Sequence, residues 1–392
     1  RRRPRAPSSF AADAGGMPAS PEHACLLRLL LSGAPASALR RLLDTHGSAE
    51  ASCGAGQRDW TSHGLDAAAC SAIRTPDPGA LARGERWLDA ASHHLVGWRD
   101  DAYPPLLRRI ASPPAMLFVA GDPALLWRPS VAVVGSRAAT AGGCANAGLF
   151  ARALAQAGLC VASGLAAGID AAAHQAALEV AGPTVAVLGT GPDIAYPVRH
   201  RPLLDRLAMA GAVISEHPPG TGALRQHFPS RNRILAGLSL GTLVVEAAEK
   251  SGALITARLA AEMGREVFAV PGSIHNPMAR GCHRLLREGA QLVESPAEVL
   301  DALAPLVVDL ARALRGQLQL LPAAPAETGD ALETDNGEYN RLWQALGHDP
   351  TGMDELVVRT GLTAAALSSM LLALELDGRI AAEHGRYARI GP

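Results

Sequence analysis

The feature that most constrains the fold is a regular alternation of apolar runs and helical segments between residues 130 and 270. Residues 131–134 and 184–188 are apolar throughout or nearly so, which is typical of strands buried on both faces of a sheet. Helical segments such as residues 142–157 separate these runs. The order predicts an α/β fold, with helices on both faces of a Rossmann-like, doubly wound and mainly parallel sheet. Further strands are expected at residues 116–120, 159–162, 212–215, 242–245 and 267–270.

Segments on either side of the sheet region predict two smaller domains. Short helical patterns fill residues 20–75, and two of them flank a turn at residues 32–37, as in a small helix-hairpin-helix or SAM-like domain. A Pro- and Ala-rich segment follows the sheet region and has little to bury, which is typical of a linker. Three helical patterns and a short hairpin then predict a winged helix. The expected domains are an extension without a fold (1–16), an N-terminal helical domain (17–90), a Rossmann-like domain (91–303), a linker (304–336) and a winged helix (337–392).

Charge and cysteine usage exclude several protein classes. The net charge is -1, which excludes a globally basic nucleic-acid coat protein, so any DNA site has to be a local patch. The six cysteines show no C-x-x-C spacing, which favours reduced thiols over a disulfide framework or a zinc site. The sequence contains no apolar run of membrane-spanning length. We therefore expect a cytoplasmic protein without a membrane partner.

Polar and glycine residues follow the predicted strands at the edge where parallel sheets bind ligands. Arg137 follows the strand predicted at residues 131–134. Its guanidinium can donate two hydrogen bonds to a phosphate. Gly164 and Gly168 lie in a turn before a helix, where free backbone amides can hold a phosphate. The residues predicted to form this part of a site are Gly135, Ser136, Arg137, Ser163, Gly164 and Gly168.

An arginine-rich segment and a second loop complete the predicted site. Residues 228–233 contain an aromatic side chain followed by two arginines that bracket an asparagine. Guanidinium groups suit phosphates, and an aromatic ring can stack on an unpaired base for about 1–3 kcal/mol. Lys250 is the only lysine of the chain and lies in a loop that opens a helix. The pattern predicts a non-catalytic binder of single-stranded nucleic acid, with ligand contacts from Phe228, Arg231, Asn232, Arg233, Lys250, Ser251 and Gly252.

Four further residues are expected to support the site. Asp170 and His174 lie four residues apart on one helix face, which suits acid–base chemistry or a local hydrogen bond that fixes the turn, and we favour the hydrogen bond. Glu246 is expected to orient Arg231 and Arg233, and Thr256 to support the second loop. The sequence lacks the dinucleotide fingerprint and the P-loop. We predict no catalytic residue, no metal ligand and no cofactor.

The predicted winged helix differs from those that read duplex DNA. Its third helix, expected within residues 363–377, contains no arginine or lysine, whereas a helix in the major groove brings cations to phosphates and base edges. A protein-contact or regulatory role is therefore favoured. Arg379, Arg386 and Arg389 keep a DNA contact by the wing open.

These segments together resemble the DNA-processing protein A (DprA/Smf) family of bacterial natural transformation. The resemblance implies a Rossmann-like domain that binds single-stranded DNA, forms homodimers and loads the RecA recombinase onto incoming strands. It also implies that DNA contacts come from Arg137, the 163–164 turn, Phe228, residues 231–233, Lys250 and Ser251. The matching segments are 103–107, 131–137, 163–170 with His174, 186–189 with 196–197, 215–216, 228–239, 245–247, 251–257 and 264–272.

Two other functions remain as alternatives. One is a Rossmann-like nucleoside-monophosphate phosphoribohydrolase, an enzyme type that holds phosphate in a P-G-G-x-G-T-x-x-E loop beside a catalytic glutamate. This chain contains Pro271-Gly272-Ser273 and Glu246 apart from each other, never in that loop. The other is a nucleotide-sensing adaptor in which DNA plays no part. Release of free base from a nucleoside monophosphate would favour the enzyme.

Overall fold

The computed structural model describes residues 21–320, 336–346, 351–363, 367, 370–371, 374, 380–383 and 386–389. Contacts divide the chain into two compact units, Arg1–Gly316 and Gln317–Pro392. The predicted extension at residues 1–16 lies outside the described residues. In the described part of the chain, none of the helices combines the length and the apolar character needed to cross a bilayer.

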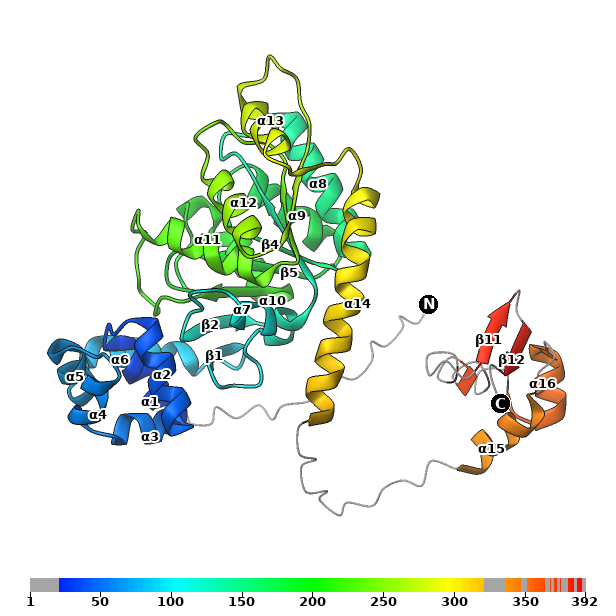
Figure 1. The fold of residues 1–392 in the computed structure, drawn as a ribbon, viewed down its shortest axis with the longest axis horizontal. Helices are drawn as coiled ribbons and strands as arrows, with labels where there is room; N and C mark the ends of the chain where they lie inside the picture. The colour runs from blue at the N-terminus through cyan, green and yellow to red at the C-terminus, as the bar shows by residue number, and fades with distance from the viewer. Residues whose placement is uncertain are drawn as a thin grey trace. The chain divides into compact units, whose positions relative to one another are not determined.

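One nine-stranded sheet organises the first unit, in the order β1-β2-β6-β5-β4-β3-β7-β8-β9 (Figure 1). The seven strands from β6 to β9 in that order run parallel to one another. At the other edge, β2 is antiparallel to β6, and β1 is antiparallel to β2. The chain proceeds outward from β3 to β6 and then returns to the other side of β3. The predicted doubly wound, mainly parallel sheet is therefore confirmed. The strands are β1 (His93–Gly97), β2 (Met116–Gly121), β3 (Ser130–Val134), β4 (Cys160–Ser163), β5 (Thr184–Leu188), β6 (Ala212–Ser215), β7 (Gly241–Val244), β8 (Glu266–Ala269) and β9 (Gln291–Leu292).

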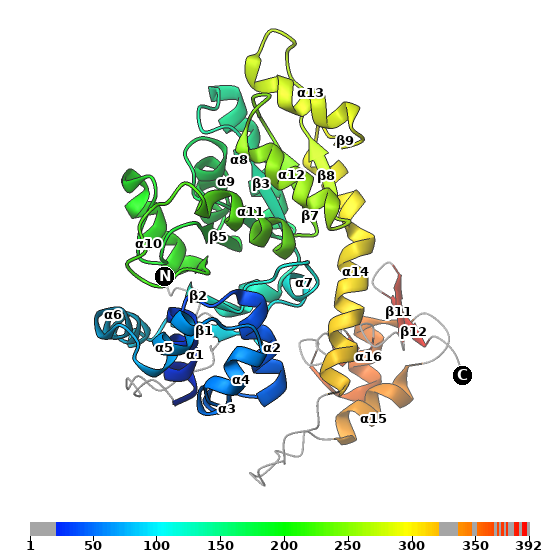
Figure 2. The ribbon, with the colours of Figure 1, turned by 60° about the vertical axis from the view of Figure 1, so that its left-hand side comes forward.

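Helices cover both faces of this sheet (Figures 1 and 2). Successive residues of β3 alternate between two cores, since Val131 and Val133 pack in one and Ala132 and Val134 in the other. Side chains of a strand point alternately to opposite faces, which is why a doubly covered strand is apolar throughout. One face carries α7 (Pro105–Arg108), α11 (His227–Leu238), α12 (Gly252–Glu262) and α13 (Arg280–Arg287). The other face carries α8 (Ala141–Gln156), α9 (Ile169–Glu179) and α14 (Pro296–Leu320). Helix α10 (Arg201–Ala210) packs against β6 and β2.

Short helices pack beside β1 and β2 at one edge of the sheet (Figure 2). Their core contains Leu27, Leu42 and Trp60 together with Phe118 of β2, so it is joined to the sheet. The predicted small helical domain is present, although the sequence analysis did not predict its last helix. The helices are α1 (Pro21–Leu31), α2 (Ala36–His46), α3 (Ala49–Gly54), α4 (Gln57–Ser62), α5 (Ala67–Arg74) and α6 (Pro78–Leu88).

The predicted linker begins too early in the sequence. Residues from 304 onward were expected to have little to bury, but α14 continues to Leu320. Leu303 and Leu310 are buried in the core that also holds Phe150 of α8. Apolar side chains at helical spacing therefore extend the packed region beyond residue 303. Residues 321–335 lie outside the described residues.

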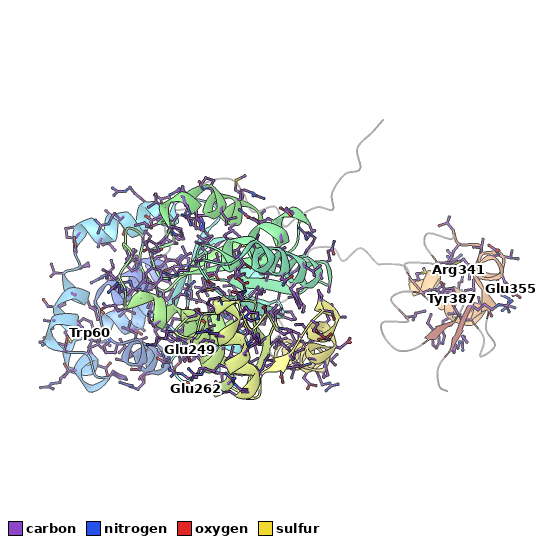
Figure 3. The ribbon with its side chains drawn as sticks, turned by 90° about the horizontal axis from the view of Figure 1, so that it is seen from above. Trp60, Glu249, Glu262, Arg341, Glu355 and Tyr387 are labelled. Atoms are coloured by element: carbon purple, nitrogen blue, oxygen red, sulfur yellow. The ribbon has the colours of Figure 1, made fainter. Side chains whose placement is uncertain are left out.

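The described residues of the second unit form two helices and a three-stranded sheet, as in a winged helix, whereas most of the predicted third helix (363–377) lies outside the described residues. Strands pair in the order β10-β12-β11, and the β11–β12 hairpin matches the predicted wing. Leu342, Leu356 and Leu371 belong to one apolar core. Figure 3 labels Glu355 and Tyr387 in this unit. Its elements are α15 (Asn336–Ala345), β10 (Thr351–Gly352), α16 (Met353–Thr360), β11 (Ile380–Glu383) and β12 (Arg386–Arg389).

Candidate functional site

A cavity of about 750 Å³ lies at the carboxyl ends of β3 and β7, and we call it the strand-end pocket. These two strands are neighbours on either side of the point where the chain reverses direction across the sheet. Such switch points are where open α/β sheets bind ligands. The pocket is lined by the residues after β3, the first turn of α11 and the start of α12. Predicted site residues in its lining are Gly135, Ser136, Arg137, Asp170, Phe228, Arg231, Asn232, Ser251, Gly252 and Thr256.

The turn after β3 places Arg137 at the rim of the pocket. A Cβ on Gly135 would lie 2.7 Å from the backbone oxygen of Glu246, so only glycine allows this approach of the two strand ends. Ser136 N donates to the same oxygen at 2.6 Å. Arg137 is exposed, and its guanidinium carbon lies 5.5 Å from the centre of the Phe228 ring. The cation thus lies over one face of the aromatic ring.

Arg231 forms a buried cation beneath this rim. Its exposed fraction is 4%, and Nη1 donates to the backbone oxygen of Val187. Nε has no hydrogen-bond partner among the described residues. Burial lowers the pKa of Arg231 to about 10, and Asp170 opposes the shift, so the group stays charged at neutral pH. It also lines a second cavity of about 270 Å³ with Tyr196 and Arg199.

The turn between β4 and α9 packs against this guanidinium. Asp170 Oδ2 accepts from the backbone N–H groups of Gly164 at 3.1 Å and Ala166 at 3.3 Å. Burial raises the pKa of the Asp170 carboxyl, while Arg231 and the two amides oppose the rise. A Cβ on Gly164 would overlap the Arg231 guanidinium. Asp170 therefore fixes the turn by local hydrogen bonds.

His174 does not bond to Asp170, so the favoured prediction of a hydrogen bond between these two side chains is wrong. Its Nδ1 lies 2.8 Å from the hydroxyl of Thr184 at the start of β5. The side chain is fully buried. Burial first, and then the Arg231 charge, lower its pKa from 6.5 to about 3. His174 is thus a neutral core residue that links α9 to β5.

This shift predicts acid sensitivity. Between pH 6.5 and about 3 the unfolded chain binds a proton at His174 that the folded chain does not, so stability falls as the pH is lowered through that window. We expect a loss of about 2 kcal/mol in the free energy of unfolding between about pH 7.5 and pH 5 from this residue. Urea unfolding of wild type and His174→Asn across that range measures it. The variant should show a correspondingly smaller pH slope, and equal slopes would contradict the assignment.

Glu246 occupies a different position from the one expected. Its carboxylate accepts from Thr140 N at 2.9 Å, Thr140 Oγ1 at 2.7 Å and Asn276 Nδ2 at 3.1 Å. It lines a separate cavity of about 150 Å³. It therefore anchors the start of α8 and does not orient Arg231 or Arg233.

Arg233 lies outside the lining of the strand-end pocket, and its guanidinium pairs with Glu216 and not with Glu246. Its Nη1 and Nη2 donate to the two oxygens of Glu216 at 2.9 Å and 2.6 Å. Its Nε donates to the backbone oxygen of Ser112 at 2.9 Å. Both arginines of this segment were expected to face the ligand, but of the two only Arg231 lines the pocket.

Four more predicted ligand residues lie outside the lining of the strand-end pocket: Ser163, Gly164, Gly168 and Lys250. Gly164 instead lines the cavity of about 270 Å³ beside Arg231. Ser163 is fully buried and donates to the backbone oxygen of Val133 at 2.7 Å, so it links β4 to β3. Lys250 is exposed and lines an adjacent cavity of about 730 Å³ together with Arg258 and Glu288. Glu249, which is labelled in Figure 3, lines the same cavity.

The start of α11 and α12 shows how the other predicted residues are held. Phe228 was expected in a loop, but it lies in the first turn of α11, with its ring centre 5.1 Å from that of Tyr196. Asn232 Nδ2 lies 3.5 Å from the backbone oxygen of Gly252 and links the two helices. Ser251 caps α12 by accepting from Ala253 N. Pocket-lining residues that were not predicted from the sequence include Tyr196, Arg225 and Met278.

Comparison with known proteins identifies relatives over most of the chain. The DNA recombination-mediator protein A family matches residues 94–304, and the DprA winged helix domain matches residues 322–386. Protein Smf of Escherichia coli (strain K12) is 41% identical over 307 residues, which are 78% of this chain and 79% of that protein. DNA processing protein DprA of Streptococcus pneumoniae (strain R6) is 48% identical over 201 residues, 51% of this chain and 71% of that protein.

Two solved structures share this fold. The X-ray structure of DprA from Streptococcus pneumoniae has a TM-score of 0.63 and 38% identity, and covers 70% of this chain and 96% of that one. DNA processing protein A from Helicobacter pylori, described for its single-stranded DNA binding mode, has a TM-score of 0.50 and 27% identity over 54% of this chain and 96% of that one.

Proposed function

Because the chain belongs to the DNA recombination-mediator protein A family, we propose that it binds single-stranded DNA in the strand-end pocket and loads RecA recombinase onto DNA taken up in natural transformation. The observation that carries the DNA-binding part is the exposed Arg137 guanidinium 5.5 Å from the Phe228 ring, above the buried cation Arg231. The two cations suit a backbone phosphate, and the partly exposed aromatic ring suits stacking by an unpaired base.

The pocket supports contacts to at least a phosphate and a base. The positive end of the α12 dipole lies at Gly252 in the pocket lining, and it favours an anion. The rings of Phe228 and Tyr196 lie 5.1 Å apart at the rim, and stacking on such rings requires bases that are not paired in a duplex. The related protein of Helicobacter pylori is described as binding single-stranded DNA, which supports the same ligand here.

We propose that the chain acts without catalysis. The residue that a phosphoribohydrolase would require, Glu246, has its carboxylate held by Thr140 and Asn276, in a cavity separate from the strand-end pocket. Incubation with nucleoside monophosphates should therefore release no free base. Release that is abolished in Glu246→Gln would establish the enzyme function.

The family also supports a homodimer, RecA as the protein partner and a cytoplasmic location, where a recombinase meets incoming strands. Loading predicts that the full chain speeds assembly of RecA filaments on single strands already coated with single-strand binding protein. Light scattering gives the oligomeric state, and RecA ATP hydrolysis on the coated strands gives the loading rate. An unchanged rate would remove the loading part of the proposal and leave DNA binding standing.

Fluorescence anisotropy with labelled oligo-dT and a duplex of equal length tests the DNA site. We expect the full chain to prefer oligo-dT and to bind it more weakly as salt rises. Arg137→Ala should weaken oligo-dT binding about tenfold, since a charged hydrogen bond contributes about 1.5–3 kcal/mol. It should also reduce the slope of log affinity against log salt by about 0.7, the value for one single-strand phosphate.

The matched control is Arg206→Ala. Arg206 is an exposed arginine of α10, and the strand-end pocket is lined by other residues. Its loss removes the same charge from the protein, so it should change affinity much less than the loss of Arg137. Equal effects of the two variants would show that binding depends on net charge and not on the pocket.

A further inference from the structure

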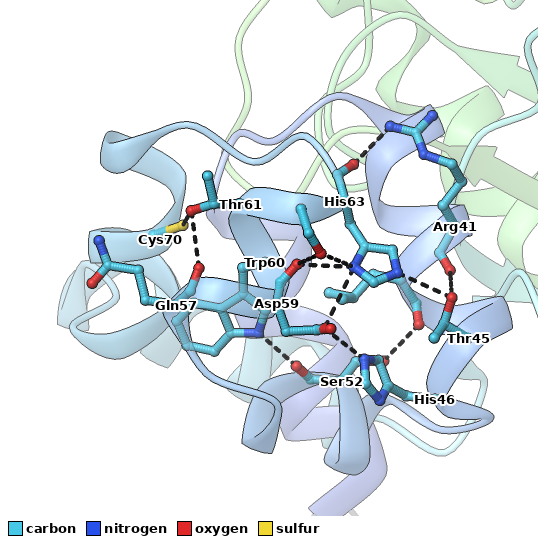
Figure 4. A network of polar contacts seen from close by, with 12 residues as sticks. Arg41, Thr45, His46, Ser52, Gln57, Asp59, Trp60, Thr61, His63 and Cys70 are labelled. Atoms are coloured by element: carbon cyan, nitrogen blue, oxygen red, sulfur yellow. Dashed lines mark hydrogen bonds and ion pairs between the residues drawn. The ribbon is translucent and has the colours of Figure 1, made fainter.

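The N-terminal helices hold a cluster of metal-ligating side chains that the DNA site does not use. His46 is the last residue of α2, Asp59 lies in α4, and His63 follows the end of α4. One ligand atom from each lies within 4.8 Å of the other two. Figure 4 shows the three side chains turned toward one another.

The distances are close to those of a metal site. Asp59 Oδ2 lies 2.7 Å from His46 Nε2 and 3.4 Å from His63 Nδ1. Ligands bound to tetrahedral zinc at about 2.0–2.1 Å are about 3.3 Å apart, so small side-chain rotations suffice to admit an ion. The side chains of His46, Asp59 and His63 are 23%, 33% and 15% exposed. An ion can therefore reach the cluster, and water can fill a fourth position.

Neighbouring groups fix the orientation of His63. Thr45 Oγ1 donates to the backbone oxygen of Arg41 at 2.9 Å, so its lone pair is available to His63 Nε2, which lies 3.0 Å away. Arg41 Nη2 donates to the backbone oxygen of His63 at 2.7 Å. With the proton on Nε2, the lone pair of Nδ1 faces two oxygens of Asp59, the backbone oxygen at 2.9 Å and Oδ2 at 3.4 Å. In that tautomer the Nδ1 lone pair and the Asp59 oxygens are arranged to bind a cation together.

We infer that His46, Asp59 and His63 bind one divalent transition-metal ion of the zinc type. Two imidazole nitrogens and one carboxylate oxygen form a ligand set suited to Zn²⁺. The two imidazoles bind the ion in their neutral form, because a ligand nitrogen cannot carry a proton.

Such an ion would connect the end of α2 to α4. These helices are otherwise held by the core around Leu42 and Trp60, and the ligands come from residues 46, 59 and 63, so the ion closes a loop of the N-terminal chain. An ion that binds only the folded chain stabilises it by mass action. The expected consequence is a Zn²⁺-dependent rise in the thermal unfolding midpoint.

The test uses the untagged full chain with Zn²⁺ in calorimetry and Co²⁺ in visible absorption. We expect one ion per chain and a tetrahedral Co²⁺ spectrum. Asp59→Asn keeps the shape of the side chain and should weaken binding at least about tenfold, as should His46→Ala and His63→Ala. Thr45→Val removes the partner of the His63 ring and should weaken binding by about 10–100-fold. Circular dichroism verifies that each variant is folded.

His275→Ala is the matched control. His275 is an exposed histidine of a loop outside the cluster, so its removal should leave Zn²⁺ affinity and the Co²⁺ spectrum unchanged. Failure to bind one equivalent of either ion overturns the inference. So does binding that is unchanged in folded Asp59→Asn, because the ion would then lie elsewhere.

Discussion

Arg231→Met is expected to weaken oligo-dT binding by about 10–100-fold and to lower the free energy of unfolding by about 3 kcal/mol. The binding loss follows from removing one charged donor, which contributes about 1.5–3 kcal/mol. The stability loss follows because the nearby Arg231 charge opposes the rise in the Asp170 pKa, and leaving a buried carboxylate without a compensating cation costs up to about 3–5 kcal/mol. Two backbone N–H groups still bond to Asp170, which places the cost at the lower end of this range.

The matched control for this variant is Arg233→Met on the same helix. Arg233 pairs with Glu216 through two hydrogen bonds, so its loss should lower stability but change oligo-dT affinity much less than Arg231→Met. Urea unfolding measures stability, and anisotropy at a temperature where both variants are folded measures affinity. If Arg233→Met weakens DNA binding as strongly as Arg231→Met, the buried cation is not the one that binds DNA.

Arg231→Lys separates the charge of the side chain from its shape. Lysine retains the cation but lacks the planar guanidinium fork, so it cannot offer a phosphate two parallel donors while it bonds to Val187. We expect affinity between those of wild type and Arg231→Met. Affinity equal to that of wild type would mean that a point charge alone is sufficient.

The sheet could be predicted from sequence because its pattern is local. Residues 131–134 are apolar throughout since neighbouring residues enter different cores. Once the strands are known, parallel pairing places Gly135–Arg137 and the end of β7 at one edge. The location of the strand-end pocket follows from these steps.

The roles of Arg231 and Arg233 could not be separated in the same way. The sequence shows two arginines two residues apart, and the segment was expected to begin in a loop. In a helix, residues two apart lie on different faces, so α11 directs Arg231 inward and Arg233 toward Glu216. The choice between Glu216 and Glu246 as the partner depends on which strand ends lie near α11, and that is a property of the tertiary structure.

Lys250 shows a different limit of sequence reasoning. It was selected because it is the only lysine in the chain and lies in a loop before a helix. Neither property says toward which cavity its side chain points. In the structure it lies one residue before the cap of α12 and faces the adjacent cavity. Tyr196 was not predicted as a site residue because it lies far from Phe228 in the sequence. The two rings come together only in the folded chain.

Gly168→Ala is expected to lower the free energy of unfolding by at least about 3 kcal/mol and to weaken oligo-dT binding at least about tenfold. Gly168 has φ 77° and ψ -123°, a conformation that costs other residues about 1–3 kcal/mol. An added Cβ would also overlap the backbone oxygen of Ser136 and lie 3.0 Å from that of Arg137. Accommodating the methyl group therefore displaces the turn that places Arg137 at the rim of the pocket.

Gly158→Ala separates this clash from backbone strain alone. Gly158 also has a positive φ, 85°, but a Cβ there meets nothing within 4 Å. We expect it to cost about 1–2 kcal/mol, the penalty of a left-handed residue, with oligo-dT affinity unchanged. Urea unfolding and anisotropy of both variants give the comparison. If Gly168→Ala lowers stability but binds oligo-dT as wild type does, then DNA binding does not depend on the position of the Ser136–Arg137 turn, and the strand-end pocket is not the DNA site.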